Sequence, residues 1–90
     1  MVTTLLTHEV KNFLEWKKGF DVGEPLRQKA GVKISGVYNS VDNPNNITII
    51  AEFQSPEAVQ GFLRHPVLRE SMEEAGVIGI PEAKILNKIN

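Results

Sequence analysis

A run of turn-forming residues near the middle of the chain constrains the fold most. The segment Asp42-Asn43-Pro44-Asn45-Asn46 concentrates residues that cap their own backbone, preset φ or tolerate the left-handed region. Before it, residues 32–39 alternate between two faces, and after it residues 47–53 are rich in β-branched side chains. We therefore expect a β-hairpin of two antiparallel strands at the centre of the chain.

The N-terminal third predicts a strand followed by two helical segments. Residues 2–10 are rich in Val, Leu and Thr and alternate with a period of two, which predicts a strand. Asn12 is a typical N-cap for the helix that follows it. Gly23 and Pro25 interrupt the helical pattern, so we expect a second, short helix over residues 25–30.

The C-terminal third repeats the order of helix and strand. Ser55 and Pro56 provide an N-cap and a first-turn proline for a helix that Pro66 redirects. Gly76 is expected to end this helix. After a connector shaped by glycine and proline, residues 82–89 alternate and predict the last strand.

The resulting order of strand, helix, strand, strand, helix and strand is that of the ferredoxin-like α+β fold, with a four-stranded antiparallel sheet and helices on one face. A length of 90 residues fits one domain over 1–90. The uncovered face is expected to mix apolar and polar side chains, its apolar members being Leu5, Val37, Ile50 and Leu86. With no cysteine to stabilise so small a core, the sequence predicts a homodimer through the open sheet face.

Several function classes do not fit the composition. A formal net charge of -1 argues against nucleic acid as a partner, because such proteins carry a strong positive charge. No apolar stretch approaches the length of a membrane span or signal peptide, so we expect a cytoplasmic protein without a membrane partner. His8 and His65 lack a second ligand residue at helical spacing, so no metal site is predicted, and no cofactor motif is present.

His8 is the candidate catalytic residue. It lies on the apolar face of the first expected strand, where an imidazole could act as a general acid or base, or could serve only as a hydrogen-bonded structural group. Trp16 lies on the apolar stripe of the first helix and could stack on a planar ligand or simply fill the core.

Three further residues are candidate ligand contacts. Arg27 could bind a ligand carboxylate in a bidentate manner, or pair with Asp21 or Glu24. Tyr38 is expected to face the helices, with its hydroxyl near the sheet edge. Met72 continues the apolar stripe of the predicted helix that Pro66 redirects, and it can fill gaps in a core or a pocket.

Four short motifs, in order and at family spacing, resemble the uncharacterised, cyclase-like proteins of the dimeric α+β barrel superfamily. The motifs are His8-x-Val10-Lys11-Asn12-Phe13-x-x-Trp16-Lys17-x-x-Phe20-Asp21, Arg27-x-x-Ala30-Gly31, Asp42-x-Pro44-Asn45 and Leu68-Arg69-Glu70-x-Met72-x-x-Ala75-Gly76-Val77. The resemblance covers nearly the whole chain and implies a dimeric α+β barrel. The superfamily includes cofactor-free antibiotic-biosynthesis monooxygenases, haem-degrading monooxygenases, muconolactone isomerases and polyketide cyclases, and members without known activity.

The monooxygenase branch of that superfamily typically has an aromatic residue at the end of the third strand and a histidine in the following helix. Phe53 matches the aromatic residue, whereas Phe62 stands where the histidine would be. Haem ligation at that position is therefore excluded.

Two hypotheses about function follow from the sequence. The first is a homodimer that binds an apolar or aromatic small molecule between sheet and helices, as a cofactor-free cyclase, isomerase or monooxygenase. The alternative is a non-catalytic dimeric interaction module whose candidate residues only fill the core and interface. The presence or absence of a pocket of roughly a few hundred Å³ with convergent polar groups would separate the two.

Overall fold

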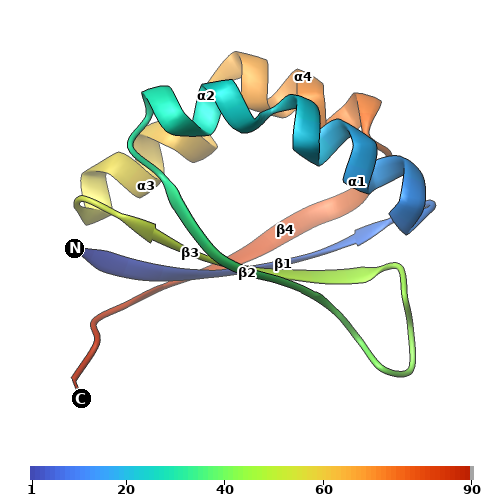
Figure 1. Cartoon of the computed structure of the whole chain (residues 1–90), viewed down its shortest axis with the longest axis horizontal. Coiled ribbons are helices and arrows are strands. Elements are labelled where there is room, and N and C mark those ends of the chain that lie inside the picture. Colours follow the sequence, from blue (N-terminus) through green and yellow to red (C-terminus); the bar gives the residue numbers. More distant parts are fainter. Residues whose placement is uncertain (90) are drawn as a thin grey trace.

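The computed structural model (Figure 1) describes residues 1–89, with the side chains of Val67, Ser71 and Ile80 left outside the description. Its elements are β1 (Val2–Val10), α1 (Phe13–Val22), α2 (Glu24–Lys29), β2 (Lys33–Asn39), β3 (Asn46–Phe53), α3 (Pro56–Leu63), α4 (Pro66–Glu74) and β4 (Val77–Leu86). The strands form one antiparallel sheet in the order β2-β3-β1-β4. All four helices cover the same face of this sheet. The predicted ferredoxin-like α+β fold is confirmed.

The start of α1 is fixed by two asparagines. The backbone N–H groups of Leu14 and Glu15 donate to Asn12 Oδ1 at 3.0 and 3.2 Å, which confirms the predicted N-cap. The N–H of Phe13 donates to Asn45 Oδ1 at 3.0 Å, so the hairpin loop contributes a second cap. Three of the free N–H groups at this helix end are thereby satisfied, and the loop is held against the helix.

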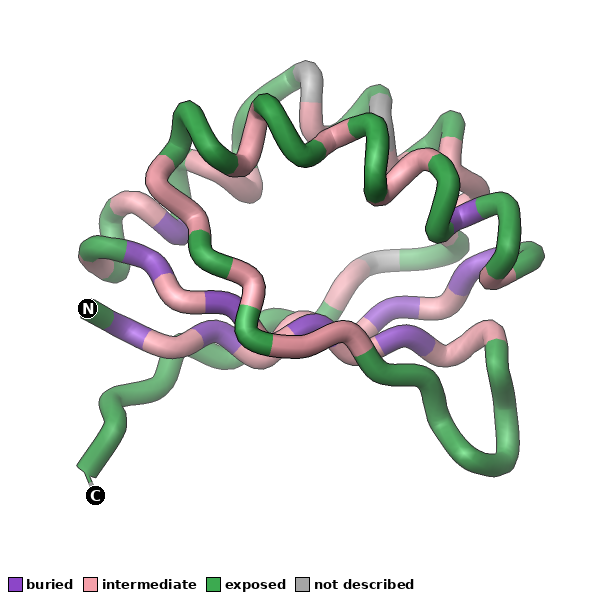
Figure 2. The backbone as a smooth tube through the Cα atoms, in the orientation of Figure 1, coloured by how far each residue is buried: buried purple, intermediate pink, exposed green. Residues whose placement is uncertain are grey.

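The core lies between the sheet and the helices because burial alternates strictly along β3 and at both ends of β1, with Leu6 partly buried between them (Figure 2). Every second residue of β3, from Ile47 to Phe53, points toward the helices and is buried. On the helical side, Trp16 and Val59 are the buried residues of α1 and α3. The predicted aromatic stripe of α1 therefore faces the sheet, with its other members partly buried against the same core.

An irregularity in β2 reverses the expected faces of its second half. The register against β3 shifts between Ile34 and Gly36, so Val37 pairs with Ile49 and packs against the core. The prediction that Val37 lies on the open face is wrong, because the bulge inserts one residue and exchanges the two faces beyond it.

The last strand begins earlier than predicted. β4 starts at Val77 rather than after Pro81, and it passes through Gly79 at a φ of +74°. The five residues of β4 from Ile78 to Glu82 lie opposite only three residues of β1, from Glu9 to Thr7. This irregularity accommodates both the left-handed glycine and a proline that lacks a ladder donor, which is why the strand continues through two strand-breaking residues.

The face opposite the helices is uncovered in this chain (Figure 1). Leu5 and Ile50 pair directly at its centre, and Leu86 and Ile78 follow on β4 with 43% and 50% exposure. Thr7 lies on the same face, where its hydroxyl lies 3.2 Å from that of Thr48. The face combines apolar side chains with paired hydroxyls, as the alternation in β1 and β3 predicts.

Candidate functional site

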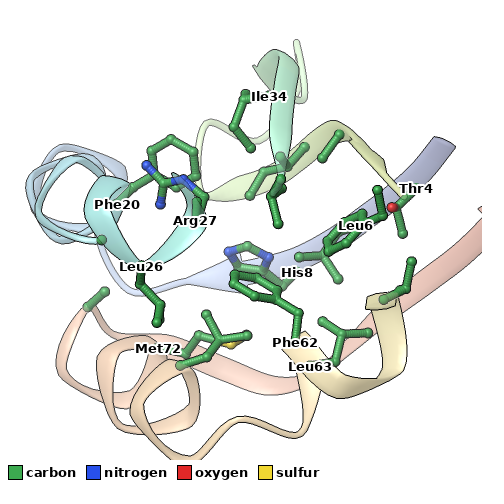
Figure 3. A pocket seen from close by; sticks show the side chains of 18 of the residues that line it. Thr4, Leu6, His8, Phe20, Leu26, Arg27, Ile34, Phe62, Leu63 and Met72 are labelled. Atoms are coloured by element: carbon green, nitrogen blue, oxygen red, sulfur yellow. The ribbon is translucent and has the colours of Figure 1, made fainter. Parts of the chain in front are cut away.

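A cavity of about 100 Å³ lies between the helix-facing side of the sheet and the helices (Figure 3). All four helices and the strands β1, β2 and β3 contribute to its walls. Leu6, Phe62 and Leu63 are typical of its mainly apolar lining. A single water needs roughly 10–15 Å³, so this volume has room for a small organic molecule. The cavity lies where the sequence analysis expects a ligand pocket, but at about 100 Å³ it is smaller than the few hundred Å³ set as the discriminating size.

His8 projects from β1 into the middle of this cavity (Figure 3). Its side chain is 5% exposed, and neither Nδ1 nor Nε2 has a hydrogen-bond partner among the described residues. Burial lowers the pKa of His8 below its usual value, because the charged imidazolium loses hydration. The ring is therefore neutral at pH 7, with one nitrogen free to donate a hydrogen bond and the other free to accept one.

Thr4 provides a second unpaired polar group in the same wall. Its hydroxyl oxygen is buried and has no hydrogen-bond partner in the part of the chain that the structure describes. Thr4 and His8 lie four residues apart on one face of β1, which separates their Cα atoms by about 13 Å along the strand. Buried polar groups are normally paired, so two such groups in one apolar cavity mark points where a ligand can hydrogen-bond.

Aromatic rings form the wall on the α1 side. The centroids of His8 and Trp16 are 5.6 Å apart, and those of Trp16 and Phe20 are 5.0 Å apart. The guanidinium carbon of Arg27 lies 3.8 Å from the centroid of Phe20, which is a close cation–π contact. The ion pair with Asp21 or Glu24 that the sequence allowed is not formed among the described residues; Asp21 instead pairs with Lys17 at 2.6 Å.

The structure brings four of the five predicted site residues together and leaves one outside. His8, Trp16, Arg27 and Met72 all line the cavity. Tyr38 does not line it: it pairs with Thr48 on the open face and is 56% exposed. The prediction that Tyr38 faces the helices is wrong, for the same reason as that for Val37: the β2 bulge exchanges the faces.

Thr4, Phe20 and Gly23 line the cavity but were not predicted as site residues. Thr4 shares the alternation of His8 in residues 2–10, so the period-two pattern contained a signal for it. Phe20 belongs to the same helical stripe as Trp16. For Gly23, the sequence signalled only a helix break; its place in a cavity wall depends on how the helices pack.

Within residues 1–89, no group of three or more His, Asp or Glu side chains is arranged to hold a metal ion. None of the described helices is long and apolar enough to cross a membrane.

No family model matches this sequence, and no curated protein matches it either. Solved structures do match. A protein from Bordetella bronchiseptica, provisionally named an antibiotic biosynthesis monooxygenase, superposes with a TM-score of 0.76 at 16% identity, over 99% of this chain and 97% of that one. Similarly named proteins are one from Nitrosomonas europaea (TM-score 0.71, 9% identity, 100% of both chains) and one from Caulobacter crescentus (0.72, 14%, 99% and 90%). At these identities the likeness establishes a shared fold.

Proposed function

We propose that this chain binds an apolar or aromatic small molecule in the cavity between sheet and helices and acts on it by acid–base chemistry without a cofactor. The observation that carries the proposal is the His8 imidazole, buried in an apolar cavity with both nitrogens unpaired among the described residues. Trp16 offers an aromatic face beside His8, and Met72 offers an adaptable apolar contact.

His8 is the proposed proton acceptor. Because burial lowers its pKa, the imidazole is neutral at pH 7 and has a lone pair available. A ligand hydroxyl or acidic C–H group beside that lone pair can transfer its proton to the ring, which leaves an anionic ligand in the cavity. Such an anion can cyclise or isomerise, or it can react with dioxygen, in which case a methylene group and O₂ yield a carbonyl group and water.

The names of the structural neighbours support the oxygenase among these three reactions. The resemblance of the sequence motifs supports the cyclase-like group. Both alternatives use the same first step, in which a neutral base within an apolar cavity removes a proton. We therefore propose the class of cofactor-free cyclase, isomerase or monooxygenase, with His8 in the same role in each.

We also propose that residues 1–90 form one domain of a homodimer that pairs through the open sheet face. Leu5 and Ile50 form the apolar centre of that face, and no helix of the chain covers it (Figure 1). Tyr38, which the β2 bulge moves to this face, adds an exposed aromatic side chain. An apolar surface of this kind is typical of an interaction site.

Titration with 2-naphthol, an aromatic molecule with one ionisable hydroxyl, tests the proposed function. The imidazole nitrogens of ¹⁵N-labelled protein are followed by NMR, with His8 assigned from the His8→Phe variant. We expect saturable shifts of both His8 nitrogens and none for His65, which is exposed outside the cavity. Unchanged His8 resonances at millimolar 2-naphthol would contradict the proposal and favour the non-catalytic dimeric module.

A further inference from the structure

We infer that the ligand is a monoanion, an apolar or aromatic molecule with one carboxylate, and that Arg27 binds this carboxylate at the α2 end of the cavity. The inference rests on the proposed function and narrows its substrate class. It depends on the surroundings of Arg27, on the shape of the neighbouring backbone and on the charge of the cavity lining.

The first observation is the position of the Arg27 guanidinium. It lies against one face of the Phe20 ring, at 3.8 Å from the ring centroid, and both residues line the cavity (Figure 3). Stacking uses a face of the planar group and leaves its N–H donors, which lie in the plane, available at the edge. Phe20 therefore holds the group in place without consuming its hydrogen bonds.

The second observation is that Arg27 has no carboxylate partner among the described residues. Burial lowers the pKa of Arg27, and the charges of Glu24 and Asp21 oppose this only in part, yet neither carboxylate forms an ion pair with the guanidinium. Asp21 is bound to Lys17 instead. A half-buried guanidinium with free donors is suited to a carboxylate, which the fork of two N–H groups matches in geometry.

The third observation is the glycine beside the guanidinium. Gly23 has a φ of -78°, which any residue can adopt, so its backbone does not require glycine. A Cβ atom at this position would lie 3.1 Å from Arg27 Nη1. Glycine thus leaves the space that the guanidinium occupies, and Gly23 also lines the cavity. A side chain at position 23 would therefore crowd the guanidinium, which would have to shift by a few tenths of an ångström.

The charge of the lining sets the number of anionic groups. Among the described lining residues, Arg27 carries the one permanent positive charge, since burial keeps His8 neutral, and none is acidic. One guanidinium neutralises one carboxylate. A dianion such as a phosphate monoester would leave charge uncompensated in an apolar cavity, which is costly. The ligand therefore places one carboxylate on Arg27 and an apolar body along His8 and Trp16.

The test compares two probes of nearly equal shape, 2-naphthoate and its neutral amide 2-naphthamide, by calorimetric titration at pH 7.5. We expect the native protein to bind naphthoate at least tenfold more tightly than naphthamide. Arg27→Gln should remove this preference by weakening naphthoate binding and leaving naphthamide binding unchanged. Lys29→Gln, which removes an exposed positive charge from the same helix outside the cavity, is the matched control and should keep the preference.

Gly23→Ala is a second variant, since its backbone angles accept alanine and its new methyl group, 3.1 Å from Arg27 Nη1, requires the guanidinium to shift by a few tenths of an ångström. It should lower the preference for naphthoate while the circular dichroism spectrum stays native. If both probes bind equally well and Arg27→Gln changes neither affinity, the inference is wrong and the proposed cavity function stands. If neither probe binds, the proposed function is overturned and the inference with it.

Discussion

Replacing His8 with phenylalanine is expected to stabilise the protein while removing its ligand response. A buried polar atom without a partner costs roughly 1–3 kcal/mol, and both ring nitrogens of His8 are in this state among the described residues. Phenylalanine keeps an aromatic ring beside Trp16, whose centroid lies 5.6 Å from that of His8, and carries no polar atom. The adjoining cavity of about 100 Å³ takes up its additional volume, which avoids the cost of overpacking.

We therefore expect the free energy of unfolding of His8→Phe to rise by about 1–3 kcal/mol. For a domain of this size, 1 kcal/mol corresponds to a change in Tm of about 4–8 °C. Thermal unfolding followed by circular dichroism measures the change, and His65→Phe, at an exposed position, serves as the control that should bring no increase. A Tm lowered by several degrees in His8→Phe would refute the reasoning, because it would show that the imidazole contributes to stability and is structural.

Three further predictions concern the N-cap of α1, the titration of His8 and the open sheet face. Asn12→Ala should lower the free energy of unfolding by about 1 kcal/mol in urea titrations, because the N–H groups of Leu14 and Glu15 lose their acceptor; an unchanged midpoint would contradict the cap. Burial lowers the pKa of His8, so below pH 6.5 this imidazole binds more protons in the unfolded state than in the folded state. The free energy of unfolding should therefore fall with decreasing pH more steeply in the native protein than in His8→Phe, by up to about 1.4 kcal/mol per pH unit. Equal slopes for the two proteins would contradict this. Ile50→Glu, which places a charge at the centre of the open face, should yield a monomer of 10.0 kDa in sedimentation experiments in which the native chain sediments as a dimer, and an unaltered dimer would exclude this interface.

The elements could be predicted where local chemistry determines them. The Asn-rich turn, the Asn12 cap and the alternation of β1 are properties of neighbouring residues, and each was predictable from the sequence. The two errors in the strands arise from bulges. The shift after Ile34 places Val37 on the core face and Tyr38 on the open face, each opposite to its predicted face. The irregularity at Gly79 extends β4, because pairing with a neighbouring strand outweighs the local pattern.

The candidate site was predictable only in part, for a related reason. His8, Trp16 and Met72 lie on apolar faces whose period reveals which way they point. Whether Arg27 pairs with Asp21 or remains open to a ligand depends on side-chain positions, and in the structure Asp21 pairs with Lys17. The packing space that Gly23 leaves for the guanidinium is a tertiary property with no signal in a single sequence beyond a helix break.

The most direct test of the central claim is an isotope-filtered NOE experiment on ¹³C-labelled protein with unlabelled 2-naphthol. It reports which side chains lie within contact distance of the bound molecule. We expect NOEs from naphthol protons to His8, Trp16 and Leu6, all of which line the cavity. NOEs confined to Leu5 and Ile50 on the open face, or none at a saturating concentration, would contradict that claim.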